Sequence, residues 1–133
     1  MDWPNLIKTA TARVTPYIRQ TPVVTFETRT VTQPVTLKLE QLQHAGSFKT
    51  RGAFNTLLGT EPPAAGLVAA SGGNHGAAVA YAAQRLGFPA RVYVPEIAGP
   101  AKISLIRACG ADLQVVPGAY SNALEQAKAW EEK

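Results

Sequence analysis

Lys49 is the residue whose position most clearly suggests chemistry. It follows Ser47 and Phe48 where a helix over residues 48–58 is expected to begin, with Ser47 as its N-cap and Gly59 as the glycine that ends it. The helix dipole and the unpaired N–H groups of a helix start repel a cation and favour the free amine of a lysine. A free amine is the form that acts as a nucleophile, for example in forming a Schiff base. A solvated surface lysine is the alternative interpretation.

A second cluster of small and polar residues joins an expected strand to an expected helix. Its members are Ser71, Gly72, Gly73, Asn74 and His75. Such a loop presents backbone N–H groups and a helix N-terminus, which together favour binding of a phosphate or a carboxylate. One alternative is an ordinary turn, in which the glycines only allow the bend. Another is a dinucleotide loop with Glu96 as the ribose-binding acid, but the adjacent glycines do not fit the G-x-G-x-x-G spacing.

The histidines and the cysteine give weaker indications of a catalytic or metal-binding role. His75 is a candidate general base, and a capping or packing role is the alternative. His44 is the only other histidine and Cys109 the only cysteine, so no set of metal ligands is visible. Cys109 is expected to be a small core residue.

The elements that must position these residues alternate between strand and helix after residue 47. Strands are expected at residues 67–71, 91–94 and 113–116, and helices at 75–86, 100–109 and from Ser121, which is the expected N-cap of the last one. The strands begin 22–24 residues apart with a helix between each pair, which is the spacing of βαβ units. The predicted fold class is therefore α/β, with a parallel sheet of βα units.

The first part of the chain has a different pattern. A helical spacing over residues 3–18 is interrupted by Pro16, and short strands are expected at residues 21–25 and 34–40, the second with one face buried. Neither strand has an obvious partner among the later ones, and the last helix reaches Lys133 without a stop signal. We therefore expect a piece of a longer protein, with a complete minimal domain as the alternative.

Composition narrows the class of protein. The 133 residues suit about one domain, and 46% hydrophobic with 17% charged residues exclude general disorder. The 13 basic residues are scattered singly, which argues against a nucleic-acid partner. A single cysteine excludes an internal disulfide framework, and there is neither a signal-peptide pattern nor an apolar stretch that could span a bilayer. We expect no membrane partner and a cytoplasmic location.

Three stretches together resemble a known family. Residues 37–43 leading into 46–53, followed by 70–76, resemble the N-terminal part of the fold-type II pyridoxal-phosphate enzymes, and are most similar to the threonine/serine dehydratases (ammonia-lyases). Residues 101–111 resemble the same subgroup. The resemblance implies that residues 1–49 are an incomplete first piece of the large cofactor-binding domain. Residues 50–133 would then be the small domain of a tryptophan synthase β-like fold, which closes over the substrate.

The resemblance also implies roles by position. Lys49 would bind pyridoxal 5'-phosphate as the Schiff-base lysine and remove the α-proton of the substrate. Phe48 would lie beside the pyridine ring, and Asn74 would bind the 3′-oxygen of the cofactor. The backbone of Ser71, Gly72, Gly73, Asn74 and His75 would hold the carboxylate of a small amino-acid substrate. The implied reaction is β-elimination from L-threonine or L-serine to a 2-oxo acid and ammonia, by an enzyme that is a homo-oligomer at full length.

Two departures from the family pattern matter. The family's serine racemases carry a serine where this chain has Gly72, which favours a lyase. The glycine-rich loop for the cofactor phosphate and the residue that meets the pyridine nitrogen come later in family members, so this chain alone is expected to be inactive. The alternatives are a threonine synthase-like or β-replacing enzyme of the same fold type, a non-catalytic anion-binding α/β module, and a nicotinamide-binding half domain.

Overall fold

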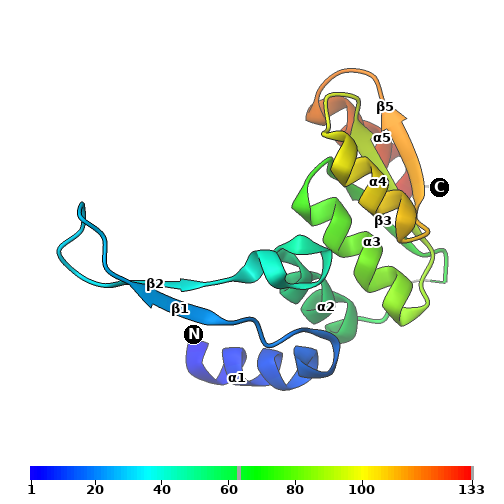
Figure 1. The fold of residues 1–133 in the computed structure, drawn as a ribbon. Helices are drawn as coiled ribbons and strands as arrows, with labels where there is room; N and C mark the ends of the chain where they lie inside the picture. The colour runs from blue at the N-terminus through cyan, green and yellow to red at the C-terminus, as the bar shows by residue number, and fades with distance from the viewer. Residues whose placement is uncertain (63, 133) are drawn as a thin grey trace.

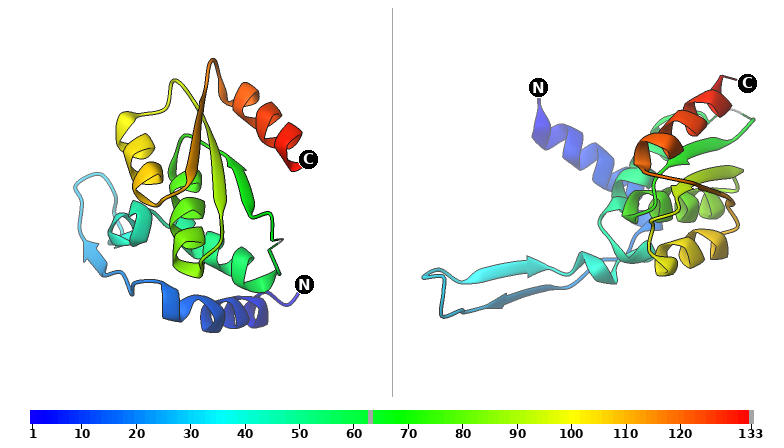
Figure 2. Two further views of the ribbon diagram at one scale, coloured as in Figure 1. Left: turned by 90° about the vertical axis from the view of Figure 1, so that its right-hand side faces the viewer. Right: turned by 90° about the horizontal axis from the view of Figure 1, so that it is seen from above.

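The molecule has two parts (Figure 1), seen here in a computed structural model that describes residues 1–62 and 64–132. The first part is a helix followed by a β-hairpin, and the second packs helices against a three-stranded sheet. The right-hand view in Figure 2 shows the hairpin projecting from the second part.

The first part begins with α1 (Trp3–Val14), capped by the Asp2 side chain, which accepts a hydrogen bond from the Asn5 N–H. The short 3₁₀ helix η1 (Thr15–Tyr17) follows, where Pro16 was expected to interrupt the helix.

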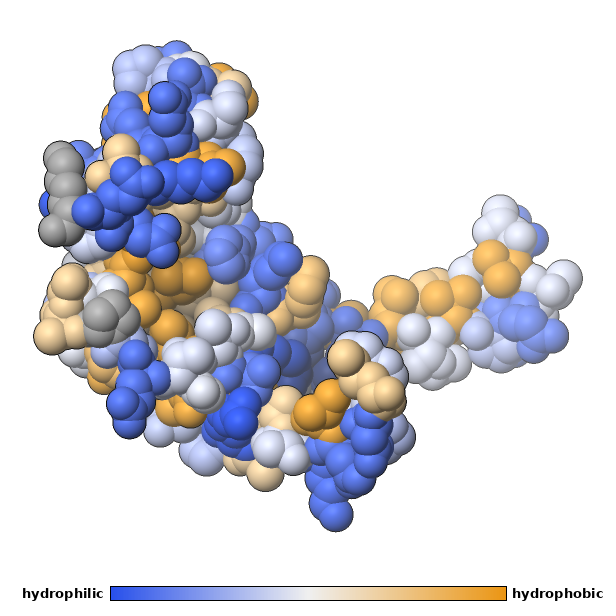
Figure 3. Space-filling model, turned by 180° about the vertical axis from the view of Figure 1, so that it is seen from behind, coloured by the Kyte–Doolittle hydropathy of each residue, from blue (hydrophilic) through white to orange (hydrophobic). Residues whose placement is uncertain are grey.

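The hairpin pairs β1 (Val23–Phe26) antiparallel with β2 (Val35–Lys38). The two expected strands are thus confirmed, and they pair with each other rather than with the later strands. The expectation that the second strand has a buried face is wrong, because β2 is exposed except for the partly buried Val35. No other described element covers either face of the hairpin, and Figure 3 shows hydrophobic residues along it.

The second part is a parallel sheet in the order β3 (Leu67–Ala70), β4 (Ala90–Pro95), β5 (Asp112–Val116). Helices α3 (Asn74–Leu86) and α4 (Pro100–Ala108) cover one face, and α5 (Tyr120–Glu131) covers the other (Figure 1). Val92 and Val94 of β4 pack toward α3 and α4, whereas Tyr93 between them packs with the alanines of α5. The predicted α/β class and its βα units are confirmed.

Helix α2 (Lys49–Gly59) packs between α1 and α3. Phe54 of α2 is fully buried against Ala78 and Ala82, whose small side chains let the two helices approach closely. Its ring stacks on Tyr17 at 5.1 Å between centroids and meets Tyr81 edge-on at 6.1 Å. One aromatic side chain therefore joins three elements.

Three expected helix ends differ from the structure. Ser47 is not the N-cap of α2: Phe48 holds that position, Ser47 is extended, and its buried hydroxyl has no hydrogen-bond partner among the described residues. Gly59 is the last residue of α2 rather than the glycine beyond it. Ser121 lies inside the first turn of α5, because Ala119 is the N-cap and its N–H donates to the Asn122 side chain. The expected end of α3 at residue 86 is confirmed, because Gly87 directly beyond it has a positive φ of 76°.

None of the helices in residues 1–62 and 64–132 is both long enough and apolar enough to cross a bilayer. In the same residues, no group of His, Cys, Asp and Glu side chains is arranged to hold a metal ion. Cys109 is buried, as expected, and burial raises the pKa of its thiol.

Candidate active site

Lys49 is exposed at the first residue of α2. The chain reaches it through two short turns, η2 (Glu40–Leu42) and η3 (His44–Gly46). Ala45 and Gly46 have φ values of 56° and 71°, and this left-handed pair redirects the chain toward α2. The Lys49 Nζ atom lies 5.3 Å from the centroid of the Phe48 ring, within cation–π range. The amine is therefore accessible beside an exposed aromatic ring.

An ion pair holds the start of α2 to the end of the hairpin. The Arg51 guanidinium donates from Nε and Nη2 to the two carboxylate oxygens of Glu40, at 2.8 and 2.7 Å. Arg51 and the Thr21 hydroxyl lower the pKa of the Glu40 carboxyl from 4.5 to about 2, against the opposing effect of burial. This two-pronged geometry fixes orientation as well as distance, two residues from Lys49.

Buried amide and hydroxyl groups hold the turns themselves. Gln43 is 2% exposed, and its side chain accepts a hydrogen bond from the Arg19 N–H and donates one to the Arg19 carbonyl, both at 2.8 Å. The Thr50 hydroxyl donates to the His44 carbonyl. The irregular segment before Lys49 is thus fixed at both ends by satisfied buried polar groups.

The predicted anion loop follows β3, at the carboxyl edge of the sheet. The Ser71 hydroxyl accepts a hydrogen bond from the Gly73 N–H at 3.2 Å, and α3 begins at Asn74 without a side-chain cap. In the part of the chain that the structure describes, no acceptor faces the N–H groups of Asn74, His75 and Gly76. Free donors at the positive end of a helix dipole are suited to binding a carboxylate or a phosphate.

Two glycines of this region are required by space. A Cβ atom on Gly72 would lie 2.5 Å from the Cβ of Ala98, and a Cβ on Gly76 would collide with the Ser71 carbonyl oxygen. A Cβ on Gly73 would meet nothing within 4 Å. The loop after β4 therefore lies so close to Gly72 that a larger residue at position 72 would fit only if the backbone or Ala98 moved.

The structure brings the two sequence motifs together. Lys49 of α2 and His75 of α3 line the same pocket of about 290 Å³, whose wall is formed by Gly52, Thr56 and Val79 among others. Partial burial lowers the pKa of the His75 imidazole, and the positive charge of Lys49 lowers it further. The predicted general-base and capping roles of His75 stay predictions.

Several other predicted site residues do not line that pocket. Phe48 and Asn74 are exposed next to Lys49 and His75 in the chain, and neither lines the pocket. Glu96, considered as a ribose-binding acid, instead accepts a hydrogen bond from the Gly118 N–H at 2.9 Å. It therefore links the loops after β4 and β5.

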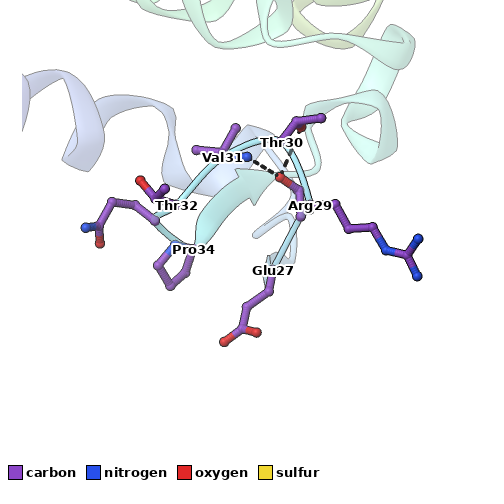
Figure 4. Close-up of a pocket in the computed structure, with 8 residues that line it drawn as sticks. Glu27, Arg29, Thr30, Val31, Thr32 and Pro34 are labelled. Carbon is purple, nitrogen blue, oxygen red and sulfur yellow. Dashed lines mark hydrogen bonds between the residues drawn. The ribbon is translucent and has the colours of Figure 1, made fainter.

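A separate hollow lies at the tip of the hairpin, and none of the predicted site residues lines it. Figure 4 shows its lining, which comes only from residues 27–34 and encloses about 380 Å³. The Thr28 hydroxyl accepts a hydrogen bond from the Val31 N–H at 3.0 Å and lies 3.3 Å from the Thr30 hydroxyl. This hollow is the inside of a loop, remote from Lys49.

Sequence reasoning missed the residues that position Lys49. Glu40, Arg51 and Gln43 act through partners 11 to 24 residues away, across irregular turns. The available signals were an acidic residue at the end of an expected strand, Glu40, and a second cation two residues after Lys49, Arg51.

Comparisons with known proteins agree on one family. The sequence model described as "Pyridoxal-phosphate dependent enzyme" matches residues 14–133. The chain is 46% identical over 109 residues to phenylserine dehydratase of Ralstonia pickettii, covering 77% of this chain and 32% of the relative. It is 43% identical over 99 residues to L-threonine ammonia-lyase of Thermotoga maritima, covering 73% of this chain and 25% of the relative.

Solved structures share the fold. The structure of maize serine racemase superposes with a TM-score of 0.87 at 32% identity, covering 96% of this chain and 40% of that one. The chain thus spans between a quarter and about a third of the length of the curated relatives that it matches.

Proposed function

The chain belongs to the family of pyridoxal-phosphate-dependent enzymes, and from this membership we propose that its protein eliminates water from a small β-hydroxy amino acid. The substrate in this proposal is L-threonine or L-serine, and the products are a 2-oxo acid and ammonia. Relatives named as dehydratases and ammonia-lyases support the reaction class. This chain would contribute the reactive lysine and the substrate loop.

The observation that carries the proposal is the pocket shared by Lys49 and His75. It puts an accessible amine beside the start of α3, where three N–H donors are free in the described residues. No described carboxylate forms an ion pair with Lys49. These residues fit the cofactor: Lys49 would bind it covalently, with Phe48 and Asn74 beside it. When bound, pyridoxal phosphate supplies an electron sink for a carbanion next to the substrate nitrogen.

The chain's own residues would perform three tasks. The N–H groups of Asn74, His75 and Gly76 would bind the substrate carboxylate and orient the molecule. The Lys49 Nζ atom would accept the proton from the α-carbon. The ion pair between Arg51 and Glu40 would keep α2, and with it Lys49, at a constant distance from the loop.

Lyase rather than racemase chemistry is supported by the position of Gly72. The serine that the family's racemases carry there would need space that Ala98 occupies, at 2.5 Å from a Cβ on Gly72. The similarity to maize serine racemase is the observation that favours the second candidate, racemisation. Assaying D-serine formation alongside ammonia release separates the two activities.

The test is activity of the full-length protein toward L-threonine and L-serine. Release of a 2-oxo acid without an added nucleophile is expected, and it would argue against a β-replacing or threonine synthase-like enzyme. Lys49→Ala should abolish release, whereas Lys102→Ala on α4 should retain it. Full activity of Lys49→Ala would contradict the proposal, and anion binding without any turnover would favour the non-catalytic module.

A further inference from the structure

A second pocket lies where α1, the base of the hairpin and α2 meet. It encloses about 340 Å³, which lies in the range of small-ligand sites. Three of its lining residues are cationic, namely Arg19, Lys38 and Arg51, and none is acidic. Lys49 and His75 do not line it, so it is separate from the candidate active site.

The cations keep donors that no described protein acceptor uses. Arg51 binds Glu40 through Nε and Nη2, which leaves Nη1. Arg19 donates from Nη1 to the Leu42 carbonyl at 3.1 Å, and Lys38 donates from Nζ to the Thr21 carbonyl at 3.0 Å. A guanidinium has five N–H donors and an ammonium three, so each side chain retains donors for a ligand.

The charges around the pocket do not balance. Glu40 is the acid that pairs with two of these cations, with its Oε1 atom 2.7 Å from Arg51 and 3.9 Å from Lys38. Arg51 and Lys38 share this single negative charge, and no described carboxylate forms an ion pair with Arg19. Gln20, whose amide can donate as well as accept, also lines the pocket. The remaining positive charge and the planar Arg donors match an oxyanion.

From these observations we propose that the pocket binds a small oxyanion of two negative charges, such as a phosphate group or a dicarboxylate. The ligand would contact α2, the hairpin base and the segment after η1 at once. It would therefore stabilise the junction that holds the lysine helix, because a ligand that binds only the folded state raises stability.

The test is a titration of the full chain with inorganic phosphate at constant ionic strength, with sodium chloride as the compensating salt. Calorimetry should show saturable binding of phosphate, and the unfolding midpoint should rise with phosphate. A parallel titration with succinate distinguishes a phosphate site from a carboxylate site. Arg19→Gln and Lys38→Gln should each weaken binding about tenfold, as expected for loss of one charge-assisted hydrogen bond.

Control variants distinguish binding in this pocket from non-specific electrostatic attraction of phosphate to the chain. Arg29→Gln at the hairpin tip and Lys102→Gln on α4 make the same change in charge and should leave binding unchanged. Arg19→Lys keeps the charge and should retain binding, which guards against misfolding of Arg19→Gln. Unsaturable uptake of phosphate, or equal weakening by the control variants, would overturn the proposal.

Discussion

At the scale of single residues, Glu40 links the end of the hairpin to the helix that carries Lys49. Its hydrogen bonds to Arg51 hold its pKa at about 2, below the ordinary value of 4.5. A depressed pKa in the folded state means that the carboxylate contributes stability above pH 4.5, and that this contribution is lost as pH falls toward 2. Glu40→Gln should therefore lower the free energy of unfolding at pH 7 by about 1–3 kcal/mol.

The same variant should lose less stability than the parent between pH 5 and pH 2. Urea unfolding across that range checks the expectation, with the exposed Glu125→Gln as the matched change. An identical pH dependence in the parent chain and in Glu40→Gln would show that the ion pair does not contribute as described.

Gly72 and Gly73, in the loop between β3 and α3, offer a matched pair of substitutions. Gly72→Ala should cost about 1–3 kcal/mol, because the added methyl group overlaps Ala98 in a packed region. Gly73→Ala should cost much less, since its Cβ would meet nothing within 4 Å. Thermal unfolding of both variants measures the difference, and equal stabilities would contradict the close approach of the loop after β4.

The positions of the candidate site residues in the fold could be predicted from sequence, but the contacts that hold them in place could not. Lys49 at a helix start and the glycine-rich turn after a strand are local patterns, readable within a few residues. The partners of Arg51 and Gln43 depend on how two short turns fold back, which no periodicity encodes. The buried hydroxyl of Ser47, which has no hydrogen-bond partner among the described residues, shows the same limit, since its residue type suits a cap that it does not form.

At the scale of elements, the packing of α2 on α3 decides whether Lys49 and His75 share a pocket. Phe54 is the large side chain at this contact and is fully buried. Phe54→Ala should lower stability by about 3–5 kcal/mol, because it leaves a cavity between Tyr17 and Tyr81. Phe48→Ala, six residues earlier and 58% exposed, is the control and should change stability little. Chemical denaturation distinguishes the two, and a small loss for Phe54→Ala would contradict the described core.

Sequence periodicity predicted the existence and order of the helices and strands well, and their ends and burial less well. The strand and helix spacing of the second part repeats strongly enough to specify a parallel sheet. The alternation in β2 was misleading because alternation indicates a buried face only where another layer covers it. The predictions that Ser47 and Ser121 are N-caps were wrong, because backbone direction as well as residue type sets where a helix begins.

At the scale of the whole molecule, the hairpin is a surface that the described chain leaves uncovered. Val23, Val24, Phe26 and Leu37 are 41% to 57% exposed, and both outer edges of the two strands are unpaired in the described residues. Exposed apolar edges favour association. We expect the chain to self-associate in sedimentation velocity, and Val24→Lys with Phe26→Lys to reduce it. A monodisperse monomer at all concentrations would contradict this expectation. The boundary between residues 49 and 50, and the homo-oligomer at full length, stay predictions.

The most direct test of the central claim is chemical trapping at Lys49. The full-length protein is mixed with pyridoxal phosphate, reduced with borohydride and digested, and the masses of its peptides are measured by mass spectrometry. The account predicts one adduct per chain, on the peptide that contains Lys49, and loss of that adduct in Lys49→Ala. An adduct on a different lysine, or one spread evenly over many lysines, would contradict the assignment of Lys49 as the reactive residue.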